Sequence, residues 1–293
     1  MTPPFDYQTF TTRNIGFVTE AEQAKLRAAK VFICGTGGMG GAALMALART
    51  GVGHVTIADL DEFEVSNLNR QVFAFTDTVG RHKAEASAEI LRRINPDIGI
   101  EVLKSDWPTA IDRIAKTVQV IVNGTDDLAA SLLLYRTARA AGLAVIDAYA
   151  SPLPSVYVTR PHEPMPEERL GYPTREKTWN AVTKEDRAAA FQAEAIHVLV
   201  HSTSRKYIDL DAAGEVAAGK RSRMSFAPMV ISTGMLMAYE VIALLLAKPT
   251  GTDCRGYFFN PYRPAVERPQ PWLIEAAMKP VVRRFLARMM QGA

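Results

Sequence analysis

Four glycines fall within six residues of this chain, directly after the apolar run 31–34 and directly before a helical stretch at 42–49. These glycines are Gly35, Gly37, Gly38 and Gly40. Glycine at a turn from strand to helix lets the backbone approach a pyrophosphate, and the start of the helix offers free N–H groups and the positive end of its dipole. The turn therefore predicts a nucleotide-binding α/β domain, and on its own it fits NAD as well as ATP.

Strand and helix patterns alternate through the first half of the chain. Short apolar runs predict strands at residues 31–34, 55–59, 100–103, 118–123 and 144–147. Longer segments between them predict helices at residues 42–49, 83–93, 109–116 and 128–141. This alternation is typical of an α/β fold of Rossmann type, with a mostly parallel, doubly wound sheet and helices on both faces.

The second half of the chain is less regular. Prolines and charges over residues 160–175 predict a long, partly mobile crossover segment, followed by a polar helix over 185–200. The apolar stretch 227–247 contains Glu240, which favours a core helix over a membrane span. No clear linker is visible, so we expect one domain: an adenylation core over residues 1–160, and the crossover excursion, late core helix and basic C-terminal tail over 161–293.

A second group of polar residues follows the glycine turn and favours ATP. Asp59 ends the second strand, where an acidic side chain can hold ribose hydroxyls, and Asp61 follows it. The block 66–71 contains Asn67, Arg70 and Gln71, and Lys83 comes soon after it. A triphosphate needs cations of this kind because its charge must be neutralised before a carboxylate can approach. Taken singly, Asn67 could cap a turn and the two cations could be solvated surface charges, but the ordered set favours a triphosphate site.

From Arg13 to Asp127 the chain resembles the ThiF/MoeB/HesA family, the bacterial relatives of ubiquitin-activating enzymes. The matching features are the glycine turn, the pair Asp59 and Asp61, the block 66–71, Lys83, the sequence Ile94-Asn95-Pro96, and residues 124–127. The resemblance implies an ATP-dependent adenylyltransferase that joins AMP to a carboxylate and releases pyrophosphate. It also implies that the carboxylate belongs to the C-terminus of a ubiquitin-like carrier protein or of a peptide, and a small-molecule carboxylate stays open.

The resemblance also assigns roles to individual residues. It implies that catalysis depends on Arg70, Lys83, Asp126 and Arg13. It implies nucleotide binding by Gly35, Gly37, Gly38, Gly40, Asp59, Asp61, Asn67 and Gln71. Asp126 would hold Mg²⁺, directly or through water. Arg13 would reach the phosphates of a partner subunit, which implies a homodimer.

The chain also departs from the family. It has no CxxC pair, so no structural zinc is expected, and no cysteine lies between residues 160 and 223 to form a thioester. We interpret Cys254 as structural, and we interpret His197 and His201 as packing or surface residues because no third metal ligand is visible. The group that finally accepts the acyl moiety is left open.

Composition adds a few expectations, and two other functions stay open. A net charge of +3 gives no reason to expect nucleic acid as a partner, and the N-terminus lacks a signal peptide, which favours the cytoplasm and no membrane association. An NAD-dependent oxidoreductase would need only the glycine turn and Asp59. A catalytically inactive nucleotide-binding subunit could retain the fold, but it could also lose Arg70, Lys83 and Asp126 freely.

Overall fold

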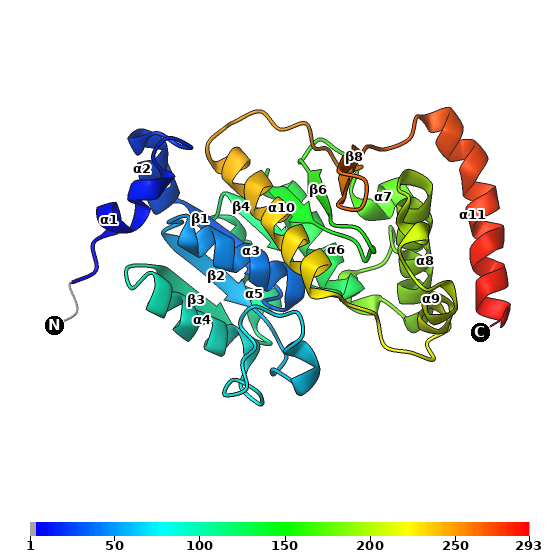
Figure 1. The fold of residues 1–293 in the computed structure, drawn as a ribbon, viewed down its shortest axis with the longest axis horizontal. Helices are drawn as coiled ribbons and strands as arrows, with labels where there is room; N and C mark the ends of the chain where they lie inside the picture. Colours follow the sequence, from blue (N-terminus) through cyan, green and yellow to red (C-terminus); the bar gives the residue numbers. More distant parts are fainter. Residues whose placement is uncertain (1–3, 293) are drawn as a thin grey trace.

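The computed structural model describes residues 4–292, and over that range its centre is one eight-stranded sheet (Figure 1) in the order β3-β2-β1-β4-β5-β6-β7-β8. The five strands from β3 to β5 are parallel, and the pairs from β5 to β8 are antiparallel. The strands are β1 (Lys30–Cys34), β2 (His54–Ala58), β3 (Gly99–Leu103), β4 (Val120–Asn123), β5 (Ala144–Asp147), β6 (Ser155–Thr159), β7 (Tyr257–Asn260) and β8 (Ala265–Glu267).

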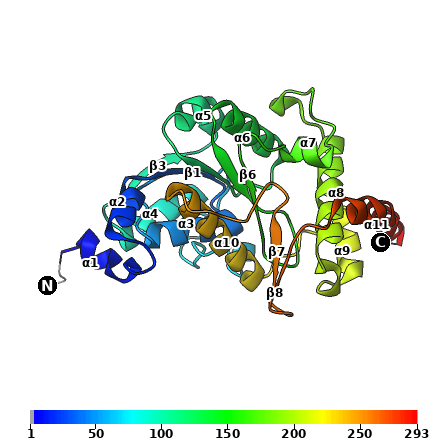
Figure 2. The same cartoon turned by 90° about the horizontal axis from the view of Figure 1, so that it is seen from above.

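Helices cover both faces of this sheet, as Figure 2 shows from above. The helices are α1 (Tyr7–Thr11), α2 (Glu20–Ala28), α3 (Gly38–Arg49), α4 (Lys83–Ile94), α5 (Trp107–Ala115), α6 (Leu128–Ala140), α7 (Pro166–Leu170), α8 (Lys184–His201), α9 (Leu210–Ala217), α10 (Ala227–Leu245) and α11 (Trp272–Gly292). Successive strand residues point to opposite faces, so Val31 and Ile33 pack in the core under α3 and α10, while Phe32 packs with α5 and α6. The predicted doubly wound α/β fold is confirmed.

The ends of the central strands define where a ligand can bind. β1 pairs with β2 on one side and with β4 on the other, so the chain order reverses beside β1. Gly35 follows β1, and its N–H donates to the Ala58 carbonyl at the end of β2, at 2.7 Å. Gly124 follows β4, and its N–H donates to the Cys34 carbonyl, at 2.7 Å. Such a switch point at the carboxyl ends of parallel strands is the usual ligand site of an open α/β sheet.

Two parts of the fold differ from expectation. Helix α3 begins at Gly38 rather than near residue 42, because Gly38 and Gly40 themselves form its first turn. The three antiparallel strands β6, β7 and β8 lie beyond the predicted series. Their three to five residues carry no alternation that would distinguish them from loop, and β8 is largely exposed.

Two arginines of α6 bind the crossover segment. Arg136 donates from Nε and Nη2 to the Glu167 carboxylate at 2.9 and 2.8 Å, and Arg139 pairs with Glu168 at 2.7 Å. Glu167 is 3% exposed, so its charge has little access to water.

We predict that Arg136→Met lowers the free energy of unfolding by about 2–3 kcal/mol, because it leaves the buried Glu167 carboxylate without its cation. The Arg136 side chain is 28% exposed, which keeps the loss below that of a fully buried pair. Denaturant unfolding measures the change. The double variant Arg136→Met/Glu167→Leu should recover part of it, and a double variant as unstable as the single one would contradict this account.

Helix α10 belongs to the core, as its composition predicted. It packs against α3 and the sheet, and it buries Val230, Met237 and Val241 there. By length and composition, α10 is also one helix of the described chain that could cross a membrane. The buried Glu240 carboxylate instead accepts a hydrogen bond from the Thr252 hydroxyl, which anchors the helix to the following loop.

Helices α8, α9 and α11 gather at the end of the molecule away from the N-terminus in both views (Figures 1 and 2). His201 of α8 is 2% exposed, and its Nδ1 accepts a hydrogen bond from the Gln270 backbone N–H at 2.9 Å. Burial lowers the pKa of His201 to about 4, and the Glu275 carboxylate opposes this change from 3.8 Å. The histidine therefore packs in its neutral form.

The pKa of His201 predicts the sign of a pH effect. Its folded value lies below the ordinary value of 6.5, so its neutral form stabilises the fold above that pH. This stability is lost as the pH falls from 6.5 through 4. Between pH 7 and 4 the wild type should lose about 2 kcal/mol more stability than His201→Gln. His162→Gln, which changes an exposed histidine, is the control. Parallel curves for the wild type and His201→Gln would contradict the prediction.

Candidate active site

A cavity of about 1520 Å³ opens at the carboxyl ends of β1, β2 and β4. It is lined by ten of the residues that the sequence predicted for the site. These are Gly35, Gly37, Gly38, Asp59, Asp61, Asn67, Arg70, Gln71, Lys83 and Asp126. Gly40 and Arg13, the other two predicted residues, do not line it. Residues that are up to 91 positions apart in sequence therefore share one site.

The glycine turn forms one wall of the cavity. Gly35 has a φ of +92°, and a Cβ there would lie 2.4 Å from the backbone carbonyl carbon and oxygen of Gly124. A Cβ at Gly40 would lie 2.0 Å from the Gly35 carbonyl oxygen, so Gly40 closes the turn from behind. Gly37 is the N-cap of α3 and supplies no side-chain cap. The first N–H groups of α3 are therefore available to an anion.

Asp59 joins the glycine turn to the end of β2. Its Oδ2 accepts hydrogen bonds from the Thr36 backbone N–H at 2.7 Å and from the Thr36 hydroxyl at 3.1 Å. Its Oδ1 accepts from the Asp61 backbone N–H at 3.0 Å. Oδ1 has a further lone pair, and Asp59 lines the cavity, so this oxygen can also accept from a hydroxyl of a bound ligand.

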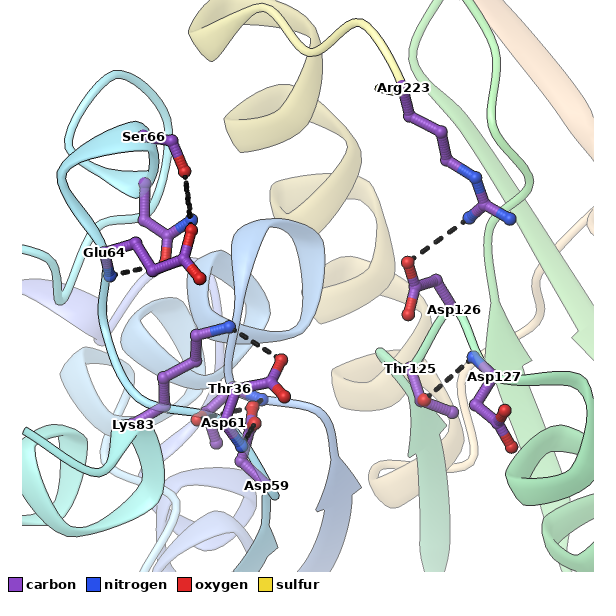
Figure 3. Close-up of polar contacts among 11 residues, drawn as sticks. Thr36, Asp59, Asp61, Glu64, Ser66, Lys83, Thr125, Asp126, Asp127 and Arg223 are labelled. Carbon is purple, nitrogen blue, oxygen red and sulfur yellow. Dashed lines mark hydrogen bonds and ion pairs between the residues drawn. The ribbon is translucent and has the colours of Figure 1, made fainter. Parts of the chain in front are cut away.

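Two cations lie beside the turn, and Figure 3 shows one of them. Lys83 is buried at the start of α4, and its Nζ pairs with the Asp61 carboxylate at 3.0 Å. Arg70 donates from Nη1 to the Ser66 carbonyl at 2.8 Å and to the Asn69 side chain at 2.9 Å. Within residues 4–292 no carboxylate pairs with Arg70, so its positive charge is available to a ligand.

The two predicted amides differ in what they can offer. Asn67 is buried, and its Oδ1 accepts from the Glu64 backbone N–H at 3.1 Å, so it fixes the turn that carries Arg70. Gln71 is 7% exposed, and its Oε1 has no hydrogen-bond partner among the described residues. Gln71 also lines the cavity, and a buried acceptor without a partner leaves room for one further donor at this oxygen.

Two acidic residues follow β4 on the other side of the site (Figure 3). The Asp126 side chain is 84% exposed, and its Oδ2 lies 3.4 Å from Nη1 of Arg223. Asp127 caps α6 and pairs with Arg187 of α8. No group of three or more metal-ligating residues occurs in the described range. One or two carboxylates fit a Mg²⁺ that arrives on phosphates and keeps several waters.

Arg13 lies outside this cavity. It is exposed on the short 3₁₀ turn Thr12–Asn14, near the N-terminal helix α1. A single chain therefore does not bring Arg13 to the glycine turn.

The two cysteines are buried, and burial raises the pKa of both thiols, which disfavours a reactive thiolate.

Sequence reasoning missed the other side of the cavity. Arg223 and Arg187 pair with the acidic residues after β4, and Phe191 of α8 lies beneath Arg223, whose Cζ is 5.1 Å from the ring centroid. The sequence carries a basic cluster at 220–223, which ends at Arg223. Nothing local indicated that its last arginine meets Asp126.

The chain was compared with families and curated proteins of known function. The ThiF family matches residues 11–271. The SAMP-activating enzyme E1 of Haloferax volcanii is 33% identical over 125 residues, which are 42% of this chain and 46% of that protein. The tRNA threonylcarbamoyladenosine dehydratase of Escherichia coli is 44% identical over 92 residues, which are 31% of this chain and 34% of that protein. The chain thus spans less than half the length of these curated relatives.

Solved structures share the fold at low sequence identity. Escherichia coli MccB with ATP superposes with a TM-score of 0.63 at 18% identity, covering 92% of this chain and 75% of that one. Escherichia coli TcdA superposes with a TM-score of 0.58 at 19% identity, covering 82% of this chain and 95% of that one. These likenesses support the fold described above.

Proposed function

The chain belongs to the ThiF family, and from this premise we propose that it is an ATP-dependent adenylyltransferase that activates a carboxylate as an acyl-adenylate. One observation carries the proposal: Arg70 and Lys83 line the same cavity as the glycine turn. A nucleotide-binding turn serves NAD and ATP alike, whereas a pair of cations beside it suits a triphosphate.

The nucleotide is proposed to bind across the end of the sheet. The backbone of Gly35, Gly37 and Gly38 and the first turn of α3 would face the phosphates, with Gly40 closing the turn behind them. Asp59 would accept from the ribose hydroxyls. Gln71 would receive a donor at its orphaned Oε1, and Asn67 would hold the turn that aims Arg70.

The reaction requires charge neutralisation more than proton transfer. A carboxylate oxygen attacks the α-phosphorus of ATP, the bond from that phosphorus to the bridging oxygen breaks, and pyrophosphate leaves with the electron pair. The nucleophile is already ionised at neutral pH, so no general base is needed. Arg70 and Lys83 would offset the repulsion between the carboxylate and the phosphates. Lys83 pairs with Asp61 at 3.0 Å, and the Asp61 side chain is 71% exposed, so it can turn to solvent and free Lys83 for the phosphates.

Magnesium fits the acidic side of the site. Mg²⁺ bound with ATP would supply further positive charge to the phosphates. Asp126 is the residue proposed to hold it, because its exposed carboxylate faces the cavity. Arg223 occupies that carboxylate at 3.4 Å, so the proposal requires this exposed ion pair to open. Exposed pairs are worth only about 0–1 kcal/mol, which makes such opening inexpensive.

The acyl substrate and the assembly are also proposals. Relatives are named for activating SAMP and for acting on a tRNA nucleoside, and MccB was solved with MccA. We propose a carrier-protein or peptide carboxylate, bound on the side formed by residues 161–293. We also propose a homodimer in which Arg13 reaches the phosphates of the partner subunit, since Arg13 is exposed and lies outside its own cavity.

Product analysis tests the proposed reaction. With ATP labelled at the α-phosphate, adenylation yields a labelled acyl-adenylate and pyrophosphate, and hydrolysis of that adenylate releases labelled AMP, whereas hydrolysis of ATP at the γ-phosphate yields labelled ADP. AMP that forms only when Mg²⁺ and a carboxylate are both present would support the proposal. Tight NAD binding without ATP binding would favour the oxidoreductase, and ATP binding without AMP formation would favour the inactive subunit.

A further inference from the structure

The cavity is larger than one nucleotide requires. Ligand pockets usually enclose about 300–1,000 Å³, and this one encloses about 1520 Å³. Beyond the glycine turn and Asp126, the cavity continues between α8, α9 and α11. Figures 1 and 2 show these three helices together at the end of the molecule away from the N-terminus. We call it the helical chamber, defined by the lining side chains of Ala195, Leu199, Leu210, Val216, Phe285 and Met289.

The helical chamber is apolar on every helix that forms it. On α8, Phe191, Ala195 and Leu199 recur every four residues and so share one face. Leu210 of α9 is 37% exposed, although it faces a concave surface. Apolar side chains that line a hollow without filling it remain in contact with water, so an apolar ligand that displaced this water would bind favourably.

Arg223 lies between the helical chamber and the glycine turn. Arg223 reaches Asp126 at 3.4 Å on one side and lies over the Phe191 ring on the other. Its side chain is 48% exposed and lines the cavity. If Mg²⁺ bound Asp126, the Arg223 guanidinium would lose its partner carboxylate. A free guanidinium can bind the carboxylate of a substrate through two parallel N–H donors.

We infer that the carboxylate activated by this chain is attached to a bulky apolar group, which occupies the helical chamber while Arg223 holds the carboxylate. This inference rests on the proposed adenylation. The chemistry required is an aliphatic or aromatic group within a few bonds of the carboxyl carbon. It can belong to a small acid or to the last residue of a peptide. A C-terminus that ends in glycines would leave the chamber filled with water and bind less tightly.

Two matched pairs of probes separate these sources. The small acids are 3-phenylpropionate and acetate, and the peptides are Gly-Gly-Gly-Phe and Gly-Gly-Gly-Gly. Their dissociation constants are measured by NMR titration of the full chain with Mg²⁺ and a non-hydrolysable ATP analogue, so binding is read independently of the reaction. We expect the apolar member of a pair to bind at least tenfold more tightly than its small partner.

Substitutions on α8 test whether the apolar probes bind in the helical chamber. Ala195→Phe fills the helical chamber, and it should weaken the apolar probes at least tenfold while the affinity for ATP changes less than twofold. Ala189→Phe makes the same substitution at an exposed position of α8, and it should change neither affinity. Should Ala195→Phe not fold, Leu199→Ser removes apolar surface without adding volume, and it should weaken the same probes.

The outcomes separate this inference from the proposed function. Preference for 3-phenylpropionate assigns a small acid, and preference for Gly-Gly-Gly-Phe alone assigns a peptide end. Apolar binding at the chamber without AMP formation supports the apolar site and refutes adenylation. Equal binding within both pairs, no binding of either apolar probe, or apolar binding that no chamber variant weakens would overturn the inference. AMP formation with Gly-Gly-Gly-Gly as fast as with Gly-Gly-Gly-Phe would overturn it and leave adenylation standing.

Discussion

Gly35→Ala is expected to lower the free energy of unfolding by about 3–5 kcal/mol and to abolish measurable ATP binding. Two costs add at this position. The φ of +92° is strained for alanine, and the new Cβ would lie 2.4 Å from the Gly124 carbonyl carbon and oxygen, which are backbone atoms with little freedom to move. Relief of that contact would separate β1 from β4 and distort the glycine turn. Denaturant unfolding and calorimetric titration with ATP measure the two effects.

Gly142→Ala is the matched control for that prediction. Gly142 also has a positive φ, of +72°, but a Cβ there would meet no heavy atom within 4 Å. It should therefore lose only about 1 kcal/mol of stability and retain ATP binding. Equal losses for the two variants would show that backbone strain alone, and not the close approach of Gly124, decides the effect.

Lys83→Met is expected to lower the rate of AMP formation about 10²- to 10³-fold while the protein remains folded. Methionine keeps the length and most of the apolar contacts of the buried lysine, so the change removes mainly the charge. The loss should appear in kcat as well as in the affinity for ATP, because the lysine is proposed to offset the repulsion that grows as the carboxylate approaches.

Arg81→Met is the control for the loss of a nearby cation. Arg81 lies two residues before Lys83, is exposed, and pairs with Glu89 at 2.5 Å instead of lining the cavity. We expect the Arg81→Met variant to form AMP at a rate within twofold of that of the wild type. A Lys83→Met enzyme that retains full activity would remove the main electrostatic argument for a triphosphate site.

Local patterns were sufficient to predict which residues meet at the glycine turn in the cavity. The glycine turn follows β1, Asp59 follows β2, and Lys83 begins α4, the helix between β2 and β3. Parallel strands bring their carboxyl ends to one edge. Their meeting in space therefore follows from the order of elements alone. Gly40 was included in the binding set for the same reason, and in the structure it supports the turn from behind instead of lining the cavity.

The opposite side of the cavity could not be predicted in this way. Arg223 meets Asp126 across 97 residues of sequence, through a loop whose path depends on the packing of α8 and α9. The helical chamber is formed by three helices whose apolar faces look like ordinary core faces in the sequence. Tertiary packing decides whether such a face fills a core or lines a cavity. The hydrophobic periodicity of the sequence is the same in both cases.

ATP–pyrophosphate exchange tests the central claim most directly, because it reports reversible formation of an acyl-adenylate. The assay uses Mg²⁺, labelled pyrophosphate, the two apolar probes, ubiquitin-like proteins and tRNA, with Asp126→Ala beside Asp112→Ala, a change at an exposed residue of α5. The account predicts that label enters ATP only when a carboxylate partner is present, and that Asp126→Ala abolishes this exchange while Asp112→Ala does not. Saturable ATP binding without exchange for any partner would contradict it.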